Sequence, residues 1–401
     1  MSSSPSSAVV EYAPLRVAFL QKHARDVNGL SDQDKHKRKR SLDSISREAA
    51  QLPSHARAHL VVLDLHRQFS SLLADQAELN RESSIVFLRS IVDAVTAHPG
   101  EADATTLPSM LSYLIPTYTA RISIRGGGGA CAEDSEELRL QLVQLLNIFL
   151  ASKSCFEAIS NSFADLAEVA KGFAMDAYHN VKAEAATAMQ LLCIAAPTKV
   201  RLSLAPLVGV CVGNMSHQRG PVRLSSLLAI EAMLPLGVDG LQTVMLSTAL
   251  PALRTLRFDR TPGVRKALAA TVAKLLSSLP NELLSVGGCE AQLILLSLAL
   301  MADETEDVTA HALMSFEVAA ASRRRILESG SNQSPYNHGL QEDSPMSIDL
   351  QTAAAAAAPD ASIQGYKGAA EAAHSMSVSL GNVPASSPTA VPHVRHSINS
   401  V

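Results

Sequence analysis

Hydrophobic side chains recur every three or four residues along most of this chain, with polar residues between them. Val264, Leu268, Val272, Leu275 and Leu279 succeed one another at steps of 4, 4, 3 and 4 residues. This spacing places them on one face of an α-helix, which has 3.6 residues per turn. The segment 138–149 has the same spacing. The pattern predicts amphipathic helices that each bury one face against a neighbour.

A polar turn, a branched apolar residue and a basic residue precede these helices at a nearly constant interval. The motif reads DRTPGVR at 259–265, HQRGPVR at 217–223 and DAYHNVK at 176–182. Val181, Val222 and Val264 within it are 41 and 42 residues apart. A fixed period of this size is typical of stacked helical hairpins of the HEAT or armadillo kind. Proline-opened first helices, as at Leu250–Pro251, fit the same scheme.

Weaker copies of the motif keep the same interval. Arg139 lies 43 residues before Lys182, and Arg81 lies 41 residues after Arg40. Asp303 opens a last copy, in which the basic residue is lost. The longer step of 58 residues from Arg81 to Arg139 is explained by a glycine-rich inter-helix insertion at 125–130. We therefore predict an all-α, HEAT/armadillo-like α-solenoid of about seven helical hairpins.

The boundaries of this solenoid are set by where the periodicity begins and ends. We expect a flexible N-terminus at 1–12, the solenoid at 13–328 and a disordered low-complexity tail at 329–401. The tail is rich in Ser, Ala and Pro and includes the six alanines Ala353–Ala358. Such a composition buries too little apolar surface to offset chain entropy.

Composition narrows the classes of function. Lys and Arg number 34 against 38 for Asp and Glu, so no global charge attracts nucleic acid or an anionic membrane. The five cysteines stand singly, as reduced thiols do in a cytosolic protein. No uninterrupted apolar run reaches the roughly 18 to 20 residues of a membrane span. We expect a soluble cytoplasmic protein that binds proteins, with no membrane, nucleic-acid or small-molecule partner.

Candidate chemistry is sparse. The glycine run at 126–129 lacks the Gly-Lys-Ser/Thr of a phosphate-binding loop, and the basic run at 35–40 is interpreted as the solvated face of a helix. No catalytic or metal-ligating motif has a diagnostic spacing, so we expect no enzyme, no cofactor and no metal.

The repeat turns themselves are the candidate site. Their basic residues are expected to bond carboxylates or carbonyls of their own or the next repeat, as a structural ladder. The predicted turn positions are Arg40, Arg81, Arg139, Asp176, Lys182, Val222, Arg223, Asp259, Pro262, Val264, Arg265 and Asp303. The partner-binding surface is not predicted by the pattern.

Three stretches carry a resemblance to a known family. They read SEELRLQLVQLL at 135–146, MSHQ at 215–218 leading into PVR at 221–223, and FDRTPGVRKA at 258–267. In this order and at these distances they resemble the HEAT-repeat dynein axonemal assembly factor family, and the likeness extends more loosely from Asp34 to Arg325. Members of that family carry further helical repeats where this chain enters its low-complexity stretch, so the chain resembles a form shortened at the C-terminus, a divergent relative or an incomplete product.

The resemblance implies a function that periodicity does not. It implies a non-catalytic cytoplasmic scaffold for preassembly of outer and inner dynein arms of cilia and flagella. Its implied partners are axonemal dynein intermediate and heavy chains, chaperones and other assembly factors. The alternative is a generic HEAT-repeat adaptor, such as a phosphatase scaffold or a transport receptor.

Overall fold

The computed structural model describes residues 12–97, 103–122, 132–237 and 240–328. The chain divides into two units, residues 1–334 and 335–401, and the second lies wholly outside the described residues. The expected flexible N-terminus, apart from its last residue, the glycine insertion and the expected disordered tail also lie outside them. All of the described helices belong to the first unit.

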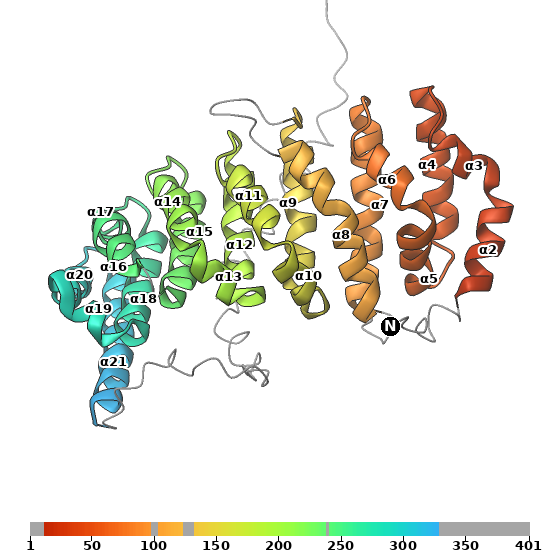
Figure 1. The fold of residues 1–401 in the computed structure, drawn as a ribbon. Helices are drawn as coiled ribbons and strands as arrows, with labels where there is room; N and C mark the ends of the chain where they lie inside the picture. The colour runs from red at the N-terminus through yellow and green to blue at the C-terminus, as the bar shows by residue number, and fades with distance from the viewer. Residues whose placement is uncertain (1–11, 98–102, 123–131, 238–239, 329–401) are drawn as a thin grey trace, which may run out of the picture. The chain divides into compact units, whose positions relative to one another are not determined.

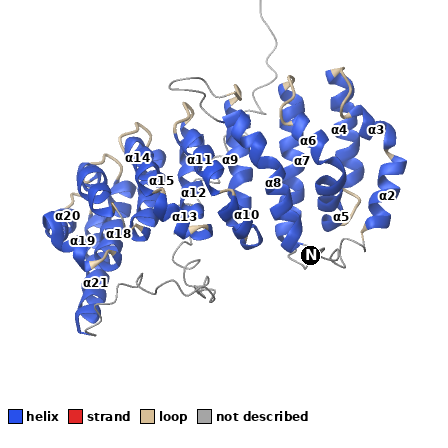
Figure 2. Ribbon diagram, in the orientation of Figure 1, coloured by secondary structure: helices blue, strands red, loops and turns tan. Residues whose placement is uncertain are grey.

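Seven helical hairpins succeed one another in chain order (Figure 1), and the described residues contain no strand (Figure 2). The predicted all-α repeat fold is therefore confirmed. The second helices of the hairpins are α4 (Lys35–Ala49), α7 (Glu78–Ala97), α9 (Glu136–Ala151), α12 (His179–Ala195), α15 (Gly220–Met233), α18 (Pro262–Ser278) and α21 (Glu306–Glu328).

The first helices are mostly broken into shorter pieces. The first hairpin has α2 (Ala13–Lys22) and α3 (Ala24–Gly29), the second has α5 (Ser54–His59), the π-helix η1 (Leu60–Leu65) and α6 (His66–Leu72), and the third has the single helix α8 (Asp103–Ile122). The fourth has η2 (Lys153–Cys155), α10 (Phe156–Asn161) and α11 (Phe163–Ala174), and the fifth has α13 (Pro197–Leu202) and α14 (Leu204–Asn214). The sixth has η3 (Leu234–Leu236), α16 (Leu241–Thr243), the π-helix η4 (Val244–Ala249) and α17 (Leu250–Leu256), and the seventh has α19 (Asn281–Ser285), η5 (Val286–Gly288) and α20 (Cys289–Met301).

One expectation about these first helices is wrong. Pro251 does not open its helix, because helical structure already begins at Leu241. The π-helix η4 ends at Ala249, two residues before the proline. Proline has no N–H for the regular α-helical hydrogen bond, and the wider turns of a π-helix can accommodate the loss of that bond. Pro262 behaves as expected and is the first residue of α18.

Each hairpin packs on the next through its second helix. α9 packs on α12, α12 on α15 and α15 on α18, and α18 packs on α21. The apolar stripe read from the sequence lies inside this stack: Leu268, Val272 and Leu275 are fully buried, and Val264 is 1% exposed. No hairpin buries its apolar face alone, so its stability depends on its neighbours.

The stretch Asn281–Met301 is long and apolar enough to span a membrane by length and composition alone, with a mean hydropathy of 1.8. It is broken between α19 and α20, where Gly287 and Gly288 have φ of 60° and 65°. A single straight helix cannot contain this left-handed backbone. The segment forms the first half of the seventh hairpin, with Leu284, Leu293 and Leu300 buried.

Candidate functional site

Every repeat turn begins with a side chain that accepts a hydrogen bond from the backbone N–H two residues later. We call these residues the turn acceptors. Their acceptor distances lie between 2.7 and 3.2 Å. This bond satisfies an N–H that the start of the following helix would leave unpaired. The seven turn acceptors are Asp32, Asp75, Glu133, Asp176, His217, Asp259 and Asp303.

Six residues after each turn acceptor, a side chain of the second helix reaches back to the same turn. Arg81 Nη1 donates to the carbonyl oxygen of Asp75 at 2.8 Å, and Arg223 Nη1 donates to that of His217 at 2.7 Å. We call these side chains the ladder residues. In order they are Arg38, Arg81, Arg139, Lys182, Arg223, Arg265 and Thr309.

Five of the ladder residues also bind the turn acceptor of the next hairpin. Arg223 binds Asp259 through Nε at 2.5 Å and Nη2 at 2.6 Å. Two parallel bonds from a planar guanidinium match the geometry of a carboxylate and hold both groups in one orientation. The other four rungs are Arg38 to Asp75, Arg81 to Glu133, Arg139 to Asp176 and Arg265 to Asp303.

These rungs lie largely out of contact with water. The side chains of Arg223 and Asp259 are 7% and 3% exposed. Burial alone would raise the pKa of Asp259, but the hydrogen bonds from Arg223 and from the N–H of Thr261 outweigh it and lower that pKa below its ordinary value. The bonds from Arg265 likewise lower the pKa of Asp303. Asp259 and Asp303 therefore stay ionised inside the stack.

The first rung differs by two residues from the sequence prediction. Arg38, and not Arg40, is the ladder residue of the first hairpin, and Asp32 is its turn acceptor. Arg40 donates to the carbonyl oxygen of His36 on an exposed part of α4. The offset of six residues fits both Asp32 to Arg38 and Asp34 to Arg40. Only packing against Asp75 distinguishes them.

The ladder lacks a carboxylate at one junction. Lys182 meets the fifth hairpin, whose turn acceptor is His217, and its Nζ donates to Asn214 Oδ1 and to the carbonyl oxygen of Ala174, both at 3.2 Å. Asn214 Nδ2 donates to the same carbonyl oxygen at 2.8 Å. A neutral amide thus replaces the ion pair. Burial lowers the pKa of Lys182.

The predicted positions omit several members of the ladder besides Arg38, among them Glu133 and Asn214. Glu133 joins Arg81 and Arg121, its Oε1 and Oε2 accepting at 2.8 and 2.5 Å, and so ties the end of α8 to the turn of the second hairpin. Asn214 belongs to the neutral junction. The offset of six residues before Arg139 could have identified Glu133. The predicted Val222 is fully buried beside the ladder.

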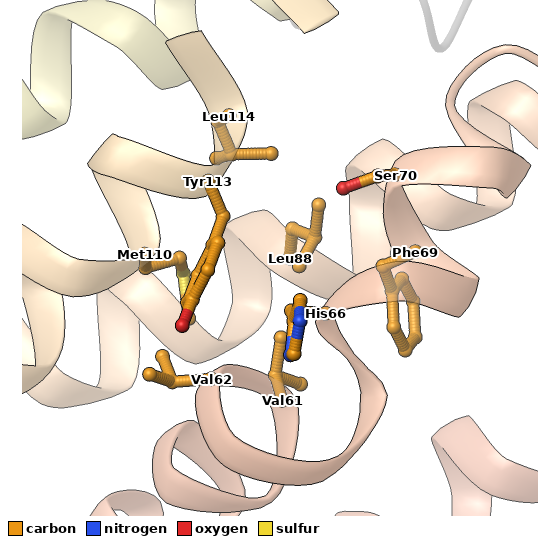
Figure 3. Close-up of a pocket in the computed structure, with 9 residues that line it drawn as sticks. All are labelled: Val61, Val62, His66, Phe69, Ser70, Leu88, Met110, Tyr113 and Leu114. Atoms are coloured by element: carbon orange, nitrogen blue, oxygen red, sulfur yellow. The ribbon is translucent and has the colours of Figure 1, made fainter. Parts of the chain in front are cut away.

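The described part of the chain holds little that could accommodate a small molecule. Figure 3 shows a hollow between the second and third hairpins, where Tyr113 of α8 extends toward Val62 and His66. The rings of His66 and Tyr113 stack with centroids 4.4 Å apart. The space suffices for about one water molecule, far less than a substrate needs. Among the described residues no group of His, Cys, Asp and Glu is placed to hold a metal ion.

Comparison with known proteins decides the family. A family model described as dynein axonemal assembly factor 5-like, TPR repeats, matches residues 29–322, which include the whole ladder from Asp32 to Thr309. The chain belongs to the dynein axonemal assembly factor 5-like family. The resemblance read from the three sequence stretches is thereby confirmed.

Named relatives of the family agree with this match. Dynein axonemal assembly factor 5 of Xenopus laevis is 27% identical over 261 residues, which cover 65% of this chain and 29% of the relative. Its human counterpart is 30% identical over 162 residues, covering 40% of this chain and 18% of the relative. The chain thus spans less than a third of the length of these relatives.

The family description speaks of TPR repeats, whose unit is 34 residues long. The hairpins of this chain recur at 41 to 44 residues wherever no insertion intervenes, which is the HEAT and armadillo range. Solved structures similar to the chain include a designed armadillo repeat protein, with a TM-score of 0.44 and 14% identity over 63% of this chain and 98% of that one.

Proposed function

We propose that this family member is a non-catalytic scaffold for the cytoplasmic preassembly of axonemal outer and inner dynein arms. The observation that carries the proposal is the family match over residues 29–322, together with relatives named for dynein assembly. Its partners would be dynein intermediate or heavy chains and the chaperones that fold them.

The ladder supports a scaffold more than an enzyme. Among the described residues, the buried Arg, Asp and Glu side chains all belong to the ladder, where they hold one hairpin to the next. Five guanidinium–carboxylate pairs, four of them with side chains at most 10% exposed, set the register between hairpins. A stack of this kind presents an extended surface of helix faces and turns, which suits the binding of other proteins.

The proposal can be tested in cells that build motile cilia. The full chain, carrying an affinity tag, is expressed in these cells and recovered from cytosol, and bound proteins are identified by mass spectrometry. We expect dynein intermediate or heavy chains. Deleting the gene should leave axonemes without dynein arms in electron micrographs, and re-expression of the protein should restore the arms.

A variant that breaks the ladder tests whether dynein chains bind the ordered stack of hairpins. The variant Asp259→Asn with Asp303→Asn removes two rungs and should reduce recovery of dynein chains if the ordered stack is required. Normal arms and motility after complete deletion would contradict the proposal. Recovery of a phosphatase catalytic subunit without any dynein chain would instead favour a generic adaptor.

A further inference from the structure

The turns of the fourth, fifth and sixth hairpins carry basic side chains for which the ladder supplies no acidic partner. They are His179, His217, Arg219, Arg257 and Arg260, of which the three arginines are exposed. Within the described residues none of the five forms an ion pair, because Asp176 and Asp259 already bind Arg139 and Arg223. The three arginines, together with Lys182, whose rung has no carboxylate, therefore concentrate positive charge along the edge formed by the turns of the fourth to sixth hairpins.

The missing rung lies in the middle of this edge. Where other hairpins place a carboxylate, the fifth has His217, whose Nδ1 accepts from the N–H of Arg219 at 3.1 Å. Burial, together with the nearby Lys182, His179 and arginines, lowers the pKa of His217. Lys182 donates to two neutral oxygens in place of a carboxylate. A carboxylate brought to this point from outside would restore the pairing found at five other junctions.

Apolar side chains stand at both sides of the missing rung. Met175 is 54% exposed and Phe258 is 75% exposed. Each immediately precedes a turn acceptor, in the fourth and sixth hairpins respectively, so both lie on the same edge as the basic residues. The Arg257 guanidinium lies 4.3 Å from the centre of the Phe258 ring. An exposed aromatic ring beside cations is a common anchor in protein interfaces.

Acidic turns limit this edge on both sides. The turn of the third hairpin carries Asp134, Glu136 and Glu137, and that of the seventh carries Glu304, Glu306 and Asp307. The basic stretch thus covers three hairpins. Two steps between helices 8 to 10 Å apart make about 20 Å, which an extended peptide spans with about six residues. A long nucleic acid would meet the acidic turns.

The basic run at 35–40 offers a contrast, since most of its cations are paired. Lys37 pairs with Asp32, Arg38 with Asp75 and Lys39 with Asp43. Three of the five Lys and Arg side chains in this run are therefore neutralised within the fold. The turns of hairpins four to six are different.

We propose that a basic turn surface formed by Met175, His179, His217, Arg219, Phe258 and Arg260 binds a short acidic segment of a partner protein. Carboxylates of the segment would lie against Arg219, Arg260 and the Lys182–His217 junction. An apolar side chain of the segment would contact Phe258 or Met175. The inference names a surface for the proposed scaffold, yet it does not require the partner to be a dynein chain.

The test uses the full chain and synthetic peptides. Fluorescence anisotropy would measure the binding of a labelled octapeptide in which leucines interrupt a run of glutamates, and of the same peptide with glutamine in place of glutamate. We expect the glutamate peptide to bind at least about tenfold more tightly, because charge pairs give this surface its specificity. Its affinity should fall as salt rises from about 50 mM to about 500 mM.

Variants of the surface decide where the peptide binds. Arg219→Glu with Arg260→Glu should weaken binding at least about tenfold. His217→Asp should also weaken it, because an internal carboxylate then occupies the missing rung, and it should raise the thermal midpoint. Arg324→Glu with Arg325→Glu, which reverses two exposed cations on α21, is the matched control and should leave the affinity within about twofold.

Three results would overturn the inference. They are equal binding of the glutamate and glutamine peptides, unchanged binding by the Arg219 and Arg260 variant, and preference for a single-stranded RNA of similar length. Because none of these measurements involves dynein, failure here would leave the proposed assembly function standing. Failure of the dynein test would equally leave this surface intact.

Discussion

The Arg223–Asp259 rung allows the ladder to be tested by a single atom exchange. Asp259→Asn keeps an oxygen that can accept from the N–H of Thr261, so the turn retains its cap. It removes the negative charge that faces Arg223, whose side chain is 7% exposed. Leaving a buried cation without its partner costs about 3 to 5 kcal/mol. We expect the variant to lose about 3 kcal/mol of unfolding free energy.

A double-mutant cycle separates the pair from its parts. Arg223→Met removes the cation while keeping most of its apolar volume. In the variant that carries both changes no buried charge is left unpaired, so its loss should be smaller than the sum of the two single losses by at least about 2 kcal/mol. Asp307→Asn, at the 73% exposed end of the Lys266–Asp307 pair, is the control and should cost less than about 1 kcal/mol.

The assay must take account of the repeat architecture. Repeat arrays need not unfold in one step, so urea unfolding followed by circular dichroism should be joined with hydrogen exchange. We expect faster exchange in α15 and α18, on both sides of the broken rung. If Asp259→Asn changed stability by no more than the Asp307→Asn control, or if the two rung substitutions were additive, the ladder would not hold these hairpins together.

Three further predictions concern the core, acid and the thiols. Leu142→Ala should cost about 2 to 5 kcal/mol in urea unfolding, because Leu142 is 5% exposed, whereas Leu295→Ala, at a side chain that is 63% exposed, should cost far less. The folded-state pKa values of Asp75, Asp259 and Asp303 are depressed, so their contribution to stability is full above the unfolded pKa of about 3.9 and is lost as pH falls through the lower folded values. Thermal midpoints should accordingly fall steeply only below about pH 4, and a drop of the same size that persists in the triple Asn variant would contradict this assignment. Burial raises the pKa of the Cys193 and Cys211 thiols to about 12, so neither should react with iodoacetamide in the folded protein at neutral pH, while both should be alkylated after denaturation, as mass spectrometry would show.

The sequence pattern was informative where the physical cause is local. A stripe such as Val264 to Leu279 is periodic because one face of a helix is buried, and the recurring turn marks each second helix. From these signals the helical class, the repeat interval and about seven hairpins could be predicted. The three matching stretches around 135–146, 215–223 and 258–267 indicated the family.

The sequence pattern gave a wrong prediction where two positions along the chain satisfy the same local rule. Arg38 and Arg40 have the same spacing from an aspartate, and only the position of Asp75 in the next hairpin favours Arg38. Pro251 is a good first residue of a helix, yet the π-helical turns before it let the helix begin at Leu241. Neither choice can be made from the neighbouring residues alone.

The amino-acid sequence by itself therefore determined the helices, their interval and most of the turn residues, because helix formation and capping act over a few positions along the chain. Only the tertiary structure decided which charged side chains form ion pairs within the fold. Partners such as Arg223 and Asp259 lie 36 residues apart in sequence and meet only when hairpins stack. For the same reason, the turns of hairpins four to six could be recognised as a basic surface without acidic partners only after the rungs on both sides had been placed.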